Sequence, residues 1–161
     1  MIFGMDTYTF VHVLLSLIGI VTGFIVLFGL LTASRMSMWT AIFIVTTLAT
    51  TLTGFGFPYT GFTPAIGVGI VSTIVLVITI AARYAFRLSG SWRWIYAGGA
   101  VLSFYLNFFV LIVQSFQKIP ALNAYAPTGS EPPFAITQGI ALLAFVVAGA
   151  LSVRTFKPAT A

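Results

Sequence analysis

The sequence predicts an all-α protein, a polytopic membrane helix bundle with five transmembrane helices, and three observations lead to it. Hydrophobic residues make up 60% of the 161 residues and charged residues only 6%, against about 25% in soluble domains. Uncharged stretches long enough to cross roughly 30 Å of membrane hydrocarbon recur along the chain. Segments rich in proline and glycine, or in arginine, separate these stretches. Two acidic and seven basic side chains are too few to cover a soluble fold, so lipid is the expected solvent.

Proline and charge mark the ends of the predicted helices. The uncharged run 36–82 is too long for one span. Pro58 and Pro64 interrupt it, because proline removes a backbone donor and clashes with the preceding turn. A second proline-rich segment, 118–133, separates the last two apolar runs and is expected to be a loop. We expect one transmembrane domain over 1–161. The predicted helices cover residues 8–33, 38–55, 65–83, 94–117 and 134–153.

The distribution of charge predicts the orientation. With five spans and the N-terminus outside, six of the seven basic residues fall on the cytoplasmic side, where lysine and arginine are enriched, and only Lys118 falls outside. The first apolar run follows Asp6 rather than basic residues and is too long for a cleaved signal peptide. The three tryptophans fall at the cytoplasmic boundary, as interfacial aromatic residues do. These six basic residues and three tryptophans are Arg35, Arg83, Arg87, Arg93, Arg154, Lys157, Trp39, Trp92 and Trp94.

Small residues on two predicted helices indicate how the bundle is held together. Apolar helices gain little from packing apolar faces in lipid, so residues that allow close approach matter more. Gly19 and Gly23 form a GxxxG pattern, which we expect to pack within the bundle rather than to form a dimer. Thr46, Thr50 and Thr53 share a helix face. Their hydroxyls are expected to bond to backbone carbonyls one turn earlier.

Polar residues inside predicted spans are candidates for ligand binding, because such groups are costly in lipid. Most of them fall in the outer third of the membrane or just above it. For Asn and Gln the alternative is a hydrogen bond to a neighbouring helix. For a lone His near the interface, the alternative is that the polar tip of its ring simply reaches water there. The simplest functional arrangement pairs His12 with Glu131, whose carboxylate would fix the tautomer and raise the histidine pKa. The candidate ligand-binding residues are His12, Asn107, Gln114, Gln117, Glu131 and Gln138.

No catalytic residue, metal site or cofactor is expected. The chain has no cysteine, one histidine and two acidic residues, whereas a metal site needs three or four such ligands. No glycine cluster is followed by the lysine or acid of a phosphate-binding motif. The net charge of +5 does not indicate a nucleic-acid partner, because the basic residues flank apolar segments. We therefore expect a protein that is not an enzyme.

The segment RYAFRLSGSWRW, residues 83–94, has two interpretations. Orientation and interfacial anchoring explain its composition. The sharper interpretation is recognition of anionic lipid headgroups, since three arginines and two tryptophans lie close together in sequence. The candidate headgroup-binding residues are Arg83, Arg87 and Arg93.

The external segment QKIPALNAYAPTGSEPPF, residues 117–134, is the least generic part of the chain, and it lies within the longer string SFQKIPALNAYAPTGSEPPFAITQ, residues 115–138. Its prolines stiffen it, so it is expected to be a lid, a docking surface for a partner or a plain connector. Together with TGFGFP and SGSWRWIY, it resembles a family of small uncharacterised bacterial inner-membrane proteins over nearly the whole chain. The resemblance implies a multi-pass protein of the bacterial inner (cytoplasmic) membrane with this segment outside. It implies no activity, cofactor or substrate.

The function expected from these features is that of a non-enzymatic accessory or scaffold subunit of a larger membrane complex or a homo-oligomer. Its expected partners are the lipid bilayer and other membrane subunits or further copies of itself. One alternative is a small transporter or channel, which needs a polar path across the bilayer. The other is a lipid-, quinone- or haem-binding protein with an outer site around His12 and Gln114.

Overall fold

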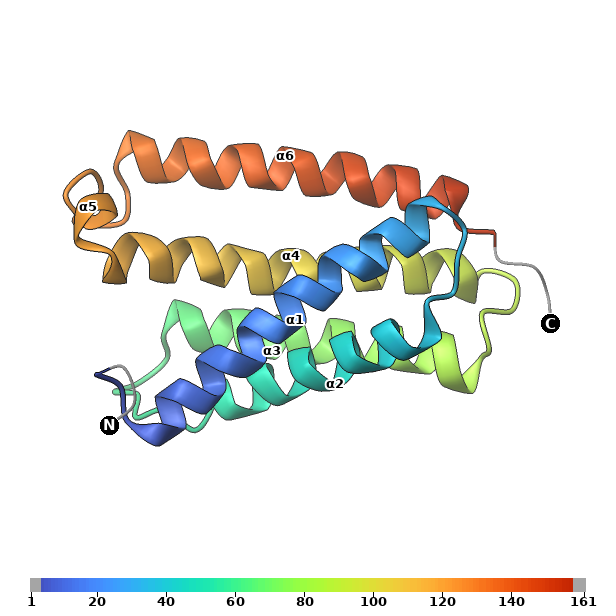
Figure 1. Cartoon of the computed structure of the whole chain (residues 1–161), viewed down its shortest axis with the longest axis horizontal. Helices are drawn as coiled ribbons and strands as arrows, with labels where there is room; N and C mark the ends of the chain where they lie inside the picture. Colours follow the sequence, from blue (N-terminus) through green and yellow to red (C-terminus); the bar gives the residue numbers. More distant parts are fainter. Residues whose placement is uncertain (1–3, 158–161) are drawn as a thin grey trace.

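The computed structural model describes residues 4–157, and this part of the chain is helical, with five long helices (Figure 1). Each long helix, with α3 counted together with η1, is long and apolar enough to cross a membrane. The prediction of an all-α fold with five such helices is confirmed. The elements in chain order are α1 (Thr7–Leu31), α2 (Ser37–Gly54), α3 (Pro64–Ile80), the π-helical turn η1 (Ala81–Ala85), α4 (Trp92–Lys118), α5 (Pro120–Asn123) and α6 (Pro132–Thr155).

Two short elements were not predicted. The expected loop after α4 contains the single turn α5, which starts at Pro120 because the fixed φ of proline and its missing N–H suit a first helical position. The carbonyl of Ile119 accepts the first bond of this turn from the Asn123 amide at 2.9 Å. The other element is η1, where the Phe86 amide donates to the Ala81 carbonyl at 2.9 Å and widens the end of α3 by one residue.

Helix α4 is the centre of the bundle. It lies between α6 and α3, while α1 crosses it diagonally and runs along α2 (Figure 1). Phe104 of α4 is buried where these helices meet. Its ring lies 4.8 Å from that of Phe24 in α1, 4.9 Å from that of Phe145 in α6 and 6.3 Å from that of Phe43 in α2. These edge-on contacts add specific geometry to the apolar core.

Close approach of α1 to its neighbours depends on two glycines. A Cβ at Gly23 would lie 2.6 Å from the Phe104 ring. A Cβ at Gly19 would lie 3.0 Å from Nδ2 of Asn107 and 3.1 Å from Oγ1 of Thr47. A side chain at position 23 would force the Phe104 ring to move, and one at position 19 would crowd Asn107 and Thr47. The GxxxG pattern packs inside the bundle, as the sequence analysis expected.

The threonines of α2 bond to their own helix. The hydroxyl of Thr46 donates to the Ile42 carbonyl at 2.7 Å, and that of Thr53 donates to the Ala49 carbonyl at 2.7 Å. Thr50 makes the same contact with the Thr46 carbonyl at 2.8 Å. The expected bonding of threonine one turn back is confirmed.

The bundle has two chemically different ends. At one, which we call the arginine end, α1 and η1 finish and α2 and α4 begin, and the last described residues also lie there (Figure 1). The opposite end holds the start of α1, the α2–α3 connection and α5. Both acidic residues, Asp6 and Glu131, and one basic residue, Lys118, belong to the opposite end. The orientation of the bundle, its placement in a membrane and its unity as one domain stay predictions.

Candidate functional site

A polar contact joins α1 to α4 near the middle of both helices. The hydroxyl of Ser16 donates to Oδ1 of Asn107 at 2.9 Å, and Nδ2 of Asn107 donates to the Ser16 carbonyl at 3.4 Å. Asn107 is only 7% exposed. Asn107 thus bonds to a neighbouring helix, which is the expected alternative to ligand binding.

His12 lies at the opposite end, between α1 and α2. Its Nδ1 is hydrogen-bonded to Oγ1 of Thr53 at 2.8 Å, and its ring meets that of Phe57 edge-on at 5.0 Å. The neighbouring Tyr8 hydroxyl donates to the Thr53 carbonyl at 2.6 Å. These contacts fix the end of α2 against the first turns of α1.

Glu131 closes a turn just before α6. Its carboxylate accepts hydrogen bonds from the Thr128 amide at 3.0 Å, the Thr128 hydroxyl at 2.8 Å and the Ser130 amide at 3.1 Å. Desolvation raises the pKa of this carboxyl, but the hydrogen bonds from Thr128 and Ser130 outweigh it and lower the pKa to about 2. His12 and Glu131 each bond within their own surroundings, so the structure does not pair them.

The three glutamines have different environments. Nε2 of Gln138 donates to the Phe109 carbonyl at 3.2 Å and joins α6 to α4. Gln114 and Gln117 are exposed. Gln114 shares a face of α4 with Asn107, seven residues away, but unlike Asn107 it is exposed. Figure 1 shows α1 diverging from α4 toward this end of the bundle. The described contacts of the six candidate ligand residues join none of them to another, so the structure does not gather them into one site.

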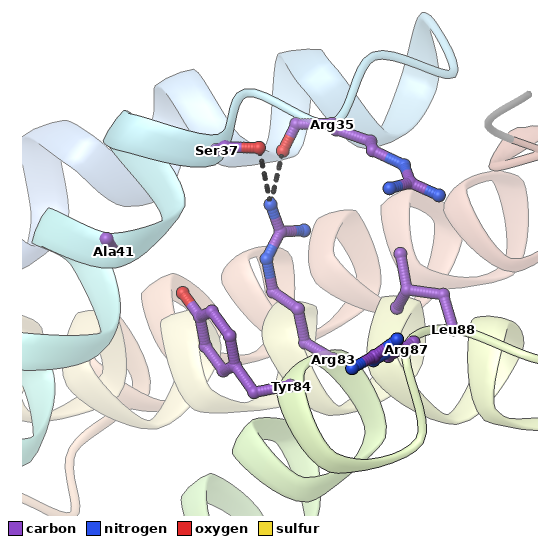
Figure 2. A pocket seen from close by; sticks show the side chains of 7 residues that line it. All are labelled: Arg35, Ser37, Ala41, Arg83, Tyr84, Arg87 and Leu88. Atoms are coloured by element: carbon purple, nitrogen blue, oxygen red, sulfur yellow. Dashed lines mark hydrogen bonds between the residues drawn. The ribbon is translucent and has the colours of Figure 1, made fainter. Parts of the chain in front are cut away.

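The arginine end contains a buried guanidinium. Arg83, on η1, is 8% exposed. Its Nη2 donates to the Arg35 carbonyl at 2.9 Å and to Oγ of Ser37 at 3.3 Å, as Figure 2 shows. The guanidinium also lies over the rings of Tyr96, at 5.0 Å, and Tyr84, at 5.8 Å. The aromatic faces stabilise the cation where water is excluded.

A hollow of about 420 Å³ adjoins Arg83 (Figure 2). Nη1 of Arg83 is buried and has no hydrogen-bond partner in the described part of the chain. Figure 2 shows Nη1 turned away from Ser37, toward the side where Arg35 and Leu88 lie. Three of the lining residues are arginines and none is acidic. The lining consists of Arg35, Ser37, Ala41, Arg83, Tyr84, Arg87 and Leu88.

Unusual backbone conformations shape two sides of the hollow. Arg87 and Leu88 have φ values of 51° and 61°, and the Leu88 amide donates to the Ala82 carbonyl at 3.0 Å to end η1. Met36, directly before Ser37, has a φ of 41°. Left-handed conformations of non-glycine residues cost roughly 1–2 kcal/mol each. The surrounding contacts must hold these turns in place, and the turns position Arg87 and Ser37.

The predicted headgroup-binding arginines are partly gathered here. Arg83 and Arg87 line the hollow, whereas Arg93, in the first turn of α4, does not. Sequence reasoning missed Arg35, in the α1–α2 turn, and Ser37, the first residue of α2, which precede Arg83 by 46 or more residues. The sequence indicated only that these residues fall on the same predicted side of the membrane as Arg83.

No protein-family model, curated protein or solved structure matches the chain. The resemblance to small bacterial inner-membrane proteins therefore rests only on the sequence segments quoted for it. Within residues 4–157, no group of three or more His, Cys, Asp or Glu side chains gathers where it could hold a metal ion.

Proposed function

We propose that the protein is a non-enzymatic multi-pass protein of a bacterial inner membrane, with its N-terminus outside and its arginine end in the cytoplasm. Its role is that of an accessory or scaffold subunit in a larger membrane complex or a homo-oligomer. Five helices of sufficient length and apolarity support the membrane part of this proposal. Six of the seven basic residues belong to the segments at the arginine end, which supports the orientation.

The subunit role rests on one observation, the ordered segment 119–131 between α4 and α6, which we call the cap. Nδ2 of Asn123 donates to the Phe116 carbonyl at 3.2 Å and ties the cap to the end of α4. Ala126 is 2% exposed and packs in a small apolar cluster with Phe116. Phe134 at the start of α6 meets the Phe116 ring edge-on at 5.5 Å. Both ends of the cap are therefore fixed.

The fixed cap holds one aromatic side chain outward. Tyr125 is 69% exposed, although its neighbour Ala126 is buried. Tyrosine is enriched among the residues that carry binding energy in protein interfaces, and a preorganised loop loses less entropy on binding. Gly19 and Gly23, the small-residue pattern of α1, are already covered inside the bundle and are not open to a partner. The cap is thus the surface that best fits a protein partner.

The two alternative functions have weaker support. A transporter or an outer ligand site needs polar groups that face a shared path or cavity. Asn107, His12 and Gln138 instead bond to Ser16, Thr53 and the Phe109 carbonyl. We do not propose either alternative.

Photo-crosslinking in the native membrane tests the subunit role. A photoreactive amino acid replaces Tyr125 in one variant and Val77 in the control, since Val77 is a comparably exposed residue of α3. We expect one adduct of discrete mass from position 125 and none from position 77, and native mass spectrometry should show the same complex weakened by Tyr125→Ser. A side chain that only anchors in lipid headgroups gives no protein adduct at position 125. That result would overturn the proposal.

The orientation can be tested separately, because the chain has no cysteine. Ala124→Cys places a thiol on the cap, and Ser89→Cys places one in the turn before α4, both at exposed positions. A membrane-impermeant maleimide should label Ala124→Cys in intact bacterial cells and Ser89→Cys only after permeabilisation. The reverse pattern would contradict the proposed orientation.

A further inference from the structure

The hollow at the arginine end concentrates positive charge. The guanidinium groups of Arg35, Arg83 and Arg87 belong to residues that line one space of about 420 Å³. The two acidic side chains of the sequence, Asp6 and Glu131, lie at the opposite end of the bundle. Arg83 and Arg87 both bring positive charge to the lining of this space, and a bound anion would offset it.

Arg83 supplies the most specific feature of the hollow. Its hydrogen bonds to the Arg35 carbonyl and Ser37 Oγ connect η1 to the start of α2. Both bonds come from Nη2. They leave Nη1 buried without a partner in the described residues. Buried polar groups are nearly always bonded, so such a group calls for an explanation. An arginine fork matches two oxygens of a phosphate group, and an anion that reaches Nη1 would complete this pairing.

The start of α2 adds a second attraction for anions. Ser37 and Ala41 are in the first two turns of α2 and line the hollow. Met36, which precedes the helix, makes no side-chain capping bond. The N-terminus of a helix carries partial positive charge and free backbone donors, which suit a phosphate group. The Ser37 hydroxyl offers a further polar contact.

Aromatic residues indicate the depth of the hollow in a membrane. Trp39 and Trp94 are exposed in the first turns of α2 and α4, and Phe86 stacks on Trp92 with ring centroids 3.9 Å apart. Tryptophan collects at the level of lipid headgroups. Tyr84, which lines the hollow, is exposed as well. The exposed tryptophans and Tyr84 therefore favour a position of the hollow at the depth of lipid phosphates over one in bulk water.

We propose that the hollow binds the phosphate group of an anionic membrane lipid from the leaflet that meets the arginine end. Arg87 and Arg35 attract the phosphate. Nη1 of Arg83 and the backbone amides at the start of α2 bind its oxygens. The lipid's acyl chains run along the exposed apolar faces beside the hollow. This site does not depend on the proposed subunit role or on which leaflet is cytoplasmic. A soluble phosphate shares the same chemistry and is distinguished by the test.

Native mass spectrometry of the purified full-length protein tests the site. The probes are dioctanoyl phosphatidic acid, dioctanoyl phosphatidylcholine and inorganic phosphate, each titrated separately. We expect phosphatidic acid to bind more tightly than the zwitterionic lipid. Arg87→Gln should weaken phosphatidic acid binding about tenfold, as expected for the loss of a hydrogen bond between charged groups, and Arg93→Gln should leave it within about twofold. Arg93 is the matched control because it lies at the same end but outside the lining.

Two results would overturn the site. Equal weakening by Arg87→Gln and Arg93→Gln would mean that general positive charge, rather than the hollow, attracts the lipid. Equal binding of phosphatidylcholine and phosphatidic acid would mean that the net negative charge of the headgroup is not recognised. Inorganic phosphate that binds as tightly as phosphatidic acid, with the same loss in Arg87→Gln, would uphold a phosphate site and overturn the lipid as its source.

Discussion

The two ends of the bundle use their polar groups differently. At the opposite end, His12 bonds to Thr53, and Glu131 is surrounded by donors from Thr128 and Ser130. At the arginine end, the buried guanidinium of Arg83 retains a nitrogen without a described partner beside two further arginines. Folding therefore gives His12 and Glu131 partners at the first end, although Oε1 of Gln138 is buried there without a described one, and it leaves Nη1 of the charged Arg83 without a described partner at the second.

This difference separates structural polarity from polarity available to a ligand. Neutral groups without a described partner also occur elsewhere, such as the hydroxyls of Thr47, Ser103 and Ser152. A neutral hydroxyl costs less to bury unpaired than a charge does. Among the described residues, the buried side-chain atoms without a partner belong to neutral groups except for Nη1 of the charged Arg83. That makes the arginine end, rather than the predicted outer side, the better place to look for a ligand.

The largest effect on stability is expected from a substitution in the core between the two ends. Gly23→Leu forces a side chain into the space of the Phe104 ring and should destabilise the whole bundle by about 3 kcal/mol, since overpacking costs 1–3 kcal/mol or more. Gly139→Leu is the control, because Gly139 on α6 faces open space. Unfolding in mixed detergent micelles measures both variants. Equal stability of the two would refute the close packing of α1 on α4.

Loss of Arg83 should separate the structural role of this residue from its ligand role. Arg83→Gln removes the bonds to the Arg35 carbonyl and Ser37, and hydrogen bonds from a charged donor contribute about 1.5–3 kcal/mol. We therefore expect a loss of about 2 kcal/mol in lipid-free micelles, measured by the same unfolding assay. Added phosphatidic acid should stabilise the native protein more than the variant. Equal stabilisation by the lipid would place its site elsewhere.

The polar contact in the middle of the bundle should be purely structural. Ser16→Ala and Asn107→Leu each remove one partner, and a double-mutant cycle should give a coupling of about 1 kcal/mol, within the range measured for membrane helices. Phosphatidic acid binding should not change in either variant. A large change in binding would connect this contact with the arginine end and weaken the separation of roles.

The smallest effect is expected in the cap. The pKa of Glu131 is lowered to about 2 from an ordinary value of 4.5, so its hydrogen bonds stabilise the cap above that ordinary value. The stabilisation is lost as the pH falls from about 4.5 through about 2. The Thr128 amide resonance should therefore titrate with a midpoint near 2, and it should not titrate in Glu131→Gln. A midpoint near 4.5 would show that the turn does not hold the carboxylate.

The sequence predicted the parts of the fold that depend on local signals. Apolar length and the prolines at 58 and 64 predict the spans and their hairpin, because both act on the chain nearby. It did not predict that His12 meets Thr53 rather than Glu131. That contact depends on the angle at which α1 crosses the bundle, and lipid-facing and core-facing sides of a membrane helix are both apolar.

The site was predictable only in part for a similar reason. Arg83 and Arg87 were singled out by their place in a basic, tryptophan-rich segment. The contribution of Arg35 and Ser37 depends on two turns with left-handed residues, including Met36 and Leu88. No glycine marks Met36 or Leu88, so composition gave no sign of these conformations.

Photolabelling with a lipid tests the contrast between the two ends most directly. The probe is a phosphatidic acid with a photoreactive group near the start of one acyl chain, incorporated into vesicles with the full-length protein. We predict adducts on the residues around Ala41, Tyr84 and Leu88, reduced by Arg87→Gln and unchanged by Arg93→Gln. Labelling spread equally over the arginine end and the segments beside the cap, with no response to Arg87→Gln, would contradict the account.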